Sequence, residues 1–165
     1  MNERSPKKIS DSRVTTYKSM MPEHSNPSPD SHFKNVNGGV ILNLIDNIAG
    51  IVALRHTRTR VVTASFDAME FLHPVRVGEL LIIKSSINFV GTSSMEVGVK
   101  VMVEDFFTGE TNVTGRAYLT FVAVDQDGKP IPAPKLILET DDDHRRFKQA
   151  QERRKIRLEH RQIRD

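Results

Sequence analysis

The sequence contains no cysteine and no long apolar run, and each absence excludes a class of protein. Without cysteine there are no disulfides and no thiol catalysis, which fits a cytoplasmic location. No run of about 18 apolar residues is present to cross a membrane, and the charged segment 1–8 lacks the apolar core of a signal peptide. His24 and His56 do not have metal-ligand spacing, so we expect no metal site.

The chain is basic only at its C-terminal end. Its 165 residues carry a net charge of +3, but residues 1–143 hold 15 Lys/Arg against 18 Asp/Glu, whereas residues 144–165 hold nine against three. Glu152 and Glu159 are available as intrahelical partners for the tail cations, as is typical of a solvated helix. The acidic body carries no nucleic-acid footprint, so we expect no nucleic-acid partner.

The apolar pattern predicts one buried helix over residues 39–55. Apolar residues recur there at three- and four-residue steps. Others fill the gaps, so the helix is apolar on nearly every face and is expected to be buried all round. The polar residues within it share one stripe by the same spacing: Asn43, Asp46, Asn47 and Gly50.

The sequence also predicts an antiparallel sheet. Apolar and polar residues alternate most clearly over 95–107, and short turns such as Thr108–Gly109–Glu110 join neighbouring strands. A proline-rich loop separates the first strand from the helix. The expected strands cover 14–21, 61–72, 80–90, 95–107 and 112–124.

One antiparallel sheet wrapped around one central helix is the hotdog architecture, an α+β fold. We expect a disordered N-terminus over 1–13, a hotdog domain over 14–138 and a charged, basic C-terminal helix over 139–165. Thr140 and Asp143 approximate a capping box at the start of that last helix. A single sheet covers only part of a helix that is apolar on every side, so we expect at least a dimer.

A single carboxylate, Asp46, interrupts the central helix. An ionised carboxylate in an apolar setting must be paired, protonated or exposed to a pocket. Asn43, Asn47 or a backbone donor could hold it in a purely structural role. Alternatively, Asp46 faces a cleft and acts as a general base or nucleophile.

Two glycines, Gly38 and Gly39, open the helix. Bare backbone at the positive end of the helix dipole suits an oxygen that becomes negative during a reaction, although close packing of the loop explains two glycines equally well. Asp46 lies eight residues after Gly38, which is roughly 12 Å along a helix axis. One carbonyl cannot touch both elements. If both serve one substrate, we expect Gly39 and Asp46 of each site to come from different chains.

Four separated segments carry a family resemblance. They read NVNGGVILNLIDNIAGIVALRH, VVTASFDAMEFLHPVRVGE, GTSSMEVGVKV and PAPKL…ETDDDHRRF. In this order they resemble the hotdog acyl-CoA thioesterases, and within these the cytosolic (brain-type) acyl-CoA hydrolases, over roughly residues 14–157. The resemblance implies hydrolysis of fatty acyl-CoA to free fatty acid and CoA with no cofactor, since coenzyme A is part of the substrate. It also implies a homo-hexamer, a trimer of dimers.

The resemblance further implies roles for single residues. By position, Asp46 matches the family's carboxylate, which activates water, and Asn35 matches its asparagine, which orients water or polarises the thioester carbonyl from the other hotdog unit. Asn37 stands where the family usually has His or Phe, and it either shares or replaces the role of Asn35 or serves as a helix N-cap.

Coenzyme A has two candidate sets of contacts. Thr92, Ser93 and Ser94 resemble a family segment near the CoA groove, and a polar turn is the plain alternative. Arg55, Arg58 and Arg60 follow the helix and suit phosphate, although solvated arginines are equally expected.

Two other functions compete with thioester hydrolysis. The segment 26–32, with its Asp and His, faintly resembles the catalytic loop of the hotdog enoyl-CoA hydratases and dehydratases. A non-enzymatic acyl-CoA sensor would share the hotdog but add a DNA-binding module, and no helix-turn-helix precedes the fold. Acyl chain length, and CoA against carrier-protein thioesters, stay open at this level.

Overall fold

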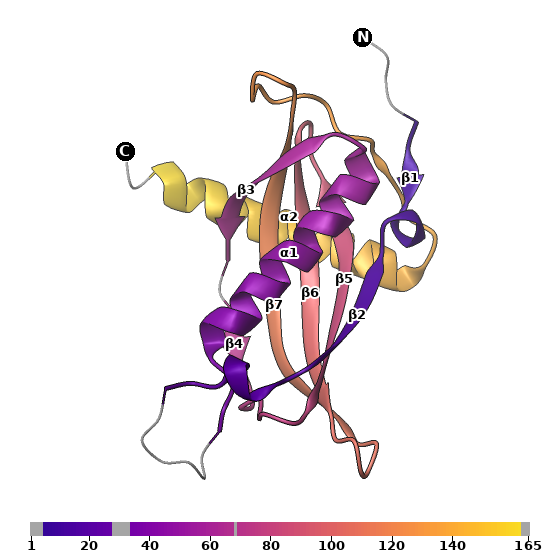
Figure 1. Ribbon diagram of the computed structural model, residues 1–165. Coiled ribbons are helices and arrows are strands. Elements are labelled where there is room, and N and C mark those ends of the chain that lie inside the picture. The colour runs from indigo at the N-terminus through magenta and orange to yellow at the C-terminus, as the bar shows by residue number, and fades with distance from the viewer. Residues whose placement is uncertain (1–4, 28–33, 68, 163–165) are drawn as a thin grey trace.

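The computed structural model describes residues 5–27, 34–67 and 69–162 of the chain. Six strands of this part form one antiparallel sheet, in the order β2-β5-β6-β7-β3, with β4 paired to β7 beside β3. The sheet curls around the long helix α1, Gly38–Thr57 (Figure 1). The strands are β2 Val14–Ser19, β3 Arg60–Phe66, β4 Glu70–Phe71, β5 Leu80–Val90, β6 Ser94–Glu104 and β7 Thr111–Val124.

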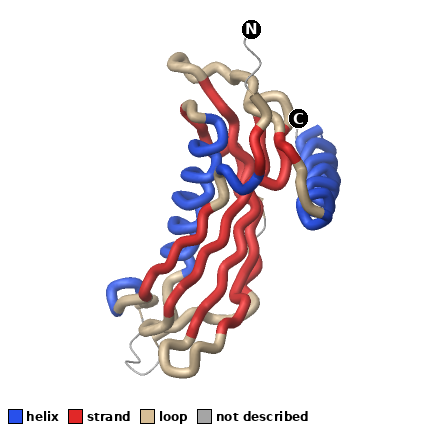
Figure 2. Tube along the Cα trace, turned by 90° about the vertical axis from the view of Figure 1, so that its right-hand side faces the viewer, coloured by secondary structure: helices blue, strands red, loops and turns tan. Residues whose placement is uncertain are grey.

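The two helices lie on opposite faces of the sheet. Figure 2 shows α1 against the concave face and α2, Asp141–Gln162, against the upper half of the convex face. Side chains of α1 such as Ile45 and Val52 are fully buried, and they pack with the inward-facing residues of the central strands in one core. The predicted hotdog architecture with a C-terminal helix is confirmed.

Most predicted elements are present, with shifted ends. The helix runs two residues beyond the expected Arg55. The single strand predicted over 61–72 is wrong, because the pairing with β7 slips between Thr63 and Ser65 and the strand ends at Phe66 before β4 resumes it. Such an irregularity bends a strand, and here it turns the edge of the sheet around α1.

The expectation of a disordered N-terminus over 1–13 is wrong for residues 7–12. Lys7–Lys8 form the short strand β1, which pairs in parallel with β8, Leu136–Ile137. A 3-10 turn, Ile9–Asp11, follows, and Ile9 is only 3% exposed. Burial of this one apolar side chain ties the chain end to the body. A second 3-10 turn spans Pro22–His24.

The prediction that the central helix is buried all round is wrong for the single chain. Ile51 and Leu54 of α1 are 44% and 46% exposed. By length and hydropathy alone α1 could cross a membrane. Its other face, however, packs against the sheet with eight buried residues, so α1 is the core helix of this domain. The open side is the one that a second copy could cover.

Candidate active site

Asp46 lies at the edge of the open stripe of α1, next to strand β3. The hydroxyl of Thr63 on β3 donates a hydrogen bond to Asp46 Oδ1 at 3.1 Å. Asn47 donates instead to Asn43, at 3.0 Å along the same stripe. The structural role considered above, in which Asn43 or Asn47 holds Asp46, is therefore not seen, and the contact comes from a strand 17 residues further along the chain.

Several large apolar side chains are exposed in the single chain. They lie on α1, on β3 and around β4, and each is between 37% and 49% exposed. Strand β3 forms an edge of the sheet, and an exposed apolar edge is a surface that pairs readily with another chain. These residues are Ile51, Leu54, Val62, Phe66, Phe71 and Leu72.

The helix start is built from a cap and two glycines. The side chain of Asn37 accepts a hydrogen bond from the N–H of Gly39 at 2.7 Å, so Asn37 is a helix N-cap. The ring of Phe71 lies 3.5 Å from where a Cβ on Gly38 would be. That distance is an ordinary van der Waals contact, so packing alone does not require glycine at position 38. The N–H of Gly39 is occupied by its own cap. A substrate oxygen at Gly39 would have to displace the amide of Asn37.

Asn35 stands at the neck of the proline-rich loop. Its carbonyl accepts a hydrogen bond from the N–H of Asn26 at 2.8 Å, and Ser25 pairs with Val36 beside it. The backbone of Asn35 also forms an isolated antiparallel β-bridge with that of Arg76. The loop thus leaves and rejoins the body at one point, where Asn26 and Asn35 are neighbours at the end of the molecule where α1 begins (Figure 1).

The predicted CoA contacts gather at the opposite end of α1. Arg58 ends the helix in the left-handed conformation, with φ 54°. Arg60 donates to the carbonyl of Gln126 at 3.2 Å and pairs in register with Val124. The turn over 92–94 is also bonded to β7, because the N–H of Ala123 donates to the carbonyl of Ser93. Arg55, Arg58, Arg60 and Thr92 are exposed, and Ser93 and Ser94 are half-buried.

Two further predictions concern the hydratase-like segment and the absence of a metal site. The hydratase-like segment 26–32 falls largely outside the described residues, since 28–33 are not described. Within the described ranges, no group of three or more His, Asp or Glu side chains could hold a metal ion.

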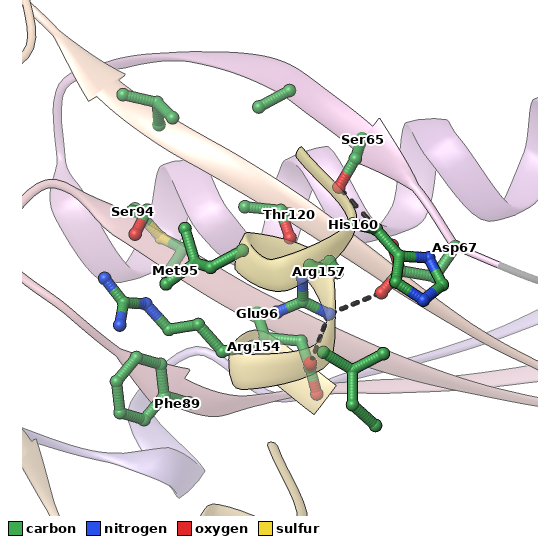
Figure 3. A pocket seen from close by; sticks show the side chains of 14 residues that line it. Ser65, Asp67, Phe89, Ser94, Met95, Glu96, Thr120, Arg154, Arg157 and His160 are labelled. Carbon is green, nitrogen blue, oxygen red and sulfur yellow. Dashed lines mark hydrogen bonds and ion pairs between the residues drawn. The ribbon is translucent and has the colours of Figure 1, made fainter. Parts of the chain in front are cut away.

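A polar network that the sequence did not predict lies across the sheet, under α2. Glu96 of β6 is 1% exposed and pairs with Arg153 at 2.7 Å and with Arg157 at 3.0 Å. Arg157 also pairs with Asp67, and the guanidinium of Arg153 lies 3.7 Å above the ring of Tyr118. Glu96, Asp67 and Arg157 border a hollow of about 460 Å³ (Figure 3). The expectation of a largely solvated tail helix is wrong at Arg153 and Arg157.

The sequence of residues 33–105 matches the family model described as the thioesterase superfamily. The chain is 40% identical over 139 residues to an uncharacterised acyl-CoA thioester hydrolase, YkhA, of Bacillus subtilis, covering 82% of this chain and 81% of that protein. The chain belongs to the thioesterase superfamily. It is therefore a member of a family of thioester hydrolases.

Other similarities extend this result. The cytosolic acyl coenzyme A thioester hydrolase of Rattus norvegicus is 38% identical over 120 residues, which cover 72% of this chain and 32% of that one. The crystal structure of an apo-hexameric acyl-CoA thioesterase superposes with a TM-score of 0.87 at 33% identity, covering 94% of this chain and 97% of that chain.

An acyl-CoA hydrolase from Staphylococcus aureus has been solved with butyryl coenzyme A, coenzyme A and coenzyme A disulfide. It superposes with a TM-score of 0.83 at 34% identity, and 96% of each chain is covered. Further structures of that hydrolase carry alanine in place of an aspartate, a threonine and an asparagine. In that protein the replaced aspartate and threonine are 17 residues apart.

Sequence reasoning did not single out two residues that lie beside the candidate residues Asp46 and Asn35. Thr63 was read only as part of a strand, and the register that brings it to Asp46 depends on a helix and a strand packing together. The signal for Thr63 was its position on the strand directly after the helix, which must run back along it. Asn26 was hidden by the length of the loop that separates it from Asn35.

Proposed function

We infer that this protein hydrolyses fatty acyl-CoA to free fatty acid and coenzyme A, with Asp46 as the residue that activates water. One observation carries the inference. Asp46 and Thr63 are hydrogen-bonded and 17 residues apart, and the staphylococcal acyl-CoA hydrolase was altered at an aspartate and a threonine with the same separation.

The geometry supports a general-base mechanism. Thr63 occupies Oδ1 of Asp46 and fixes the plane of the carboxylate, while the half-exposed side chain leaves the other oxygen to a water molecule. That oxygen takes a proton as the water oxygen attacks the thioester carbonyl carbon. The carbonyl oxygen becomes negative, displaces the side chain of Asn37 from the N–H of Gly39 at the helix start, and is stabilised there. The C–S bond then breaks to give the fatty acid, and the leaving CoA thiolate takes the proton held by Asp46, which returns to the carboxylate.

The active site is proposed to be shared between two copies. Asp46 and the helix start of one chain are separated by roughly 12 Å along the helix axis. This separation is too large for both to contact one thioester group. The apolar surface on α1 and β3 gives two copies a reason to associate. A symmetric dimer would place the helix start of each copy opposite Asp46 of the other. By likeness to the hexameric relatives, we expect three such dimers in a homo-hexamer.

Asn26 and Asn35 are both candidates for the catalytic asparagine. In the staphylococcal hydrolase the replaced asparagine precedes the replaced aspartate by 15 residues. Here that position is Ser31, so the asparagine must be differently spaced. The neck of the loop brings Asn26 beside Asn35, and removal of the residues between them would give Asn26 a spacing closer to that of the relative. We therefore favour Asn26 and keep Asn35 as the alternative.

Arg58, Arg60 and the turn over 92–94 are proposed to hold the phosphates of coenzyme A. They lie near one another beyond the C-terminal end of α1, because Arg60 pairs with Val124 while the neighbouring Ala123 bonds to Ser93. Cytoplasmic location is proposed in the same way, because relatives include a cytosolic hydrolase.

A thiol-release assay across acyl-CoA chain lengths tests the function. We expect turnover by the wild type and a loss of about 10²- to 10⁴-fold in kcat for Asp46→Asn. Asn43→Ala, on the same stripe of α1, is the matched control and should keep most of the activity. Comparable rates in wild type and Asp46→Asn would remove Asp46 from the mechanism. Hydration of crotonyl-CoA without free thiol would indicate a hydratase, and tight CoA binding without turnover would indicate a sensor.

A mixing experiment tests the shared site. Asp46→Ala and Asn26→Ala chains, each inactive alone, are unfolded and refolded together. In a symmetric dimer each mixed pair regains one complete site, so about a quarter of wild-type activity should return. No recovery, with mixed oligomers shown by mass spectrometry, would contradict sharing between these two residues. The same experiment with Asn35→Ala decides between the two asparagines.

A further inference from the structure

Three cations stand side by side on the convex face of the sheet. Lys84 of β5 pairs in register with Lys100 of β6, and Lys100 pairs in register with Arg116 of β7. All three are exposed. Neighbouring strands lie about 4.8 Å apart, so the row places three positive charges within roughly 10 Å across the sheet.

This row is unfavourable as it stands. Like charges directly opposite each other on neighbouring strands destabilise a sheet. Among the described residues, none of the three cations forms an ion pair or a side-chain hydrogen bond. Glu70 lies opposite Arg116 in register, but these two side chains do not pair either. An anion bound across the row would offset the repulsion.

The row forms part of the floor of a groove under α2. The groove holds about 1120 Å³, and the first turns of α2 form one of its walls. Arg13, Arg145 and Arg146 add further cations. Of the carboxylates, Asp142 is already held by Arg145 and Arg146, and Asp143 caps α2. Glu152 is the remaining negative group along the wall, so the surplus charge of the groove is positive.

The groove is separate from the candidate active site of the same chain. It opens under α2 on the convex face, whereas Asp46 belongs to α1 on the concave face (Figure 2). The sheet stands between the two. A ligand in the groove therefore does not compete directly for the carboxylate of its own chain.

We propose that this groove binds a small anion that carries two or more phosphoryl groups. Two adjacent phosphoryl groups match a row of three cations, since each lies between two positive side chains. Arg116 adds the planar fork that suits phosphate. The same chemistry is found in a free nucleoside diphosphate and in the diphosphate of coenzyme A. The proposal does not depend on thioester hydrolysis by this protein.

Calorimetric titration with inorganic pyrophosphate at low ionic strength tests the proposal. We expect saturable binding and a rise in Tm at fixed protein concentration. Lys100→Gln, in the middle of the row, should weaken binding about tenfold and raise the Tm of the ligand-free protein. Lys148→Gln, an exposed cation elsewhere on α2, is the matched control and should leave binding unchanged.

Two results would overturn the proposal. The first is no saturable pyrophosphate binding by the wild type, or equal affinity in wild type and Lys100→Gln. The second is dissociation of the oligomer by Lys100→Gln with pyrophosphate affinity unchanged, which would make the row a contact between copies. Titrations with ADP and with coenzyme A then identify the source. A groove for free nucleotide loses ADP affinity in Lys100→Gln with KM for acyl-CoA unchanged, whereas a groove for coenzyme A shows a raised KM.

Discussion

The two faces of the sheet hold their helices by different forces. On the concave face α1 is held by apolar side chains buried in one core, and a side-chain hydrogen bond from Thr63 of the sheet to Asp46 links its polar stripe to β3. On the convex face α2 is fastened by charge, through Glu96 with Arg153 and Arg157. The first arrangement leaves one side of the helix free, whereas the second occupies the helix residues that face the sheet.

This difference explains where chemistry is placed. Apolar packing is non-directional, so α1 can carry polar residues along its open stripe and still pack against the sheet. A buried ion network needs each of its members, because loss of one leaves a charge without its partner. The helix with the greater freedom is the one that carries the candidate carboxylate.

The largest effect is expected from a substitution that disrupts the apolar packing of α1 on the concave face. Ile45 of α1 has no exposed surface, so Ile45→Ala should lower the free energy of unfolding by about 3–4 kcal/mol. The matched control is Ile156→Ala on α2, because Ile156 is 52% exposed, and it should cost less than about 1 kcal/mol. Urea denaturation at one protein concentration measures both. Equal losses would contradict the assignment of α1 to the core.

The next largest effect is expected from a substitution that disrupts the ion pairs between the convex face and α2. Glu96→Gln removes the buried anion that Arg153 and Arg157 share. The two arginines are about a fifth to a quarter exposed and regain some hydration, so we expect a loss of about 2 kcal/mol in unfolding free energy. Amide hydrogen exchange should rise in α2 and stay slow in α1. Glu159→Gln on α2 is the control, and an equal effect there would show that the network does not hold the helix.

A smaller effect concerns the single polar link on the concave face. Thr63→Val keeps the shape of the side chain but removes the hydroxyl that donates to Asp46. We expect kcat for thioester hydrolysis to fall about tenfold with little change in KM, because a hydrogen bond to a charged group is lost. Thr63→Ser should restore the rate. An unchanged rate in Thr63→Val would mean that Asp46 is oriented by other groups.

The smallest effect is a pH dependence at the far end of α1. His56 is fully buried, its Nε2 bonds to the carbonyl of Pro134 at 2.8 Å, and its Nδ1 has no partner in the described part of the chain. Burial lowers the pKa of His56. Below about pH 6.5 His56 takes up a proton in the unfolded chain but resists protonation in the folded chain. The free energy of unfolding therefore falls as the pH falls through that range.

Unfolding free energies measured between pH 7.5 and 5.5 test this dependence. The loss should be at most about 1.4 kcal/mol per pH unit from this one group. It should disappear in His56→Gln and persist in His144→Gln, since His144 is exposed. An unchanged slope in His56→Gln would assign the dependence to other groups.

The sequence predicted the extent of the central helix and strands better than the pairing between distant segments. The central helix and the strands from 80 to 124 were located to within three residues at each end, because hydrophobic periodicity records which side chains are buried. The break at Thr63–Ser65 and the pairing of residues 7–8 with 136–137 were missed. Both depend on register between distant segments, which periodicity does not contain.

The candidate site divides in the same way. Asp46 stood out because a carboxylate is unexpected in an apolar helix. Its partner Thr63 did not, since a threonine in a strand is ordinary. Glu96 lies on the strand face opposite the apolar residues, and nothing in its own pattern indicates that arginines 57 and 61 residues further along the chain cover it. A side chain becomes predictable when its own type is costly in its setting, and not when only its partner is unusual.

The narrow neck at Asn26 and Asn35 gives this chain a ready insertion point. Because the two ends of the loop are already bonded to each other, the length of what lies between them is thermodynamically cheap, at about 0.6 kcal/mol for each doubling. A fluorescent reporter or a ligand-controlled module could be spliced there, between two residues whose backbones are already bonded. Such a hybrid would sit beside the helix start and convert occupancy of that region into an optical signal.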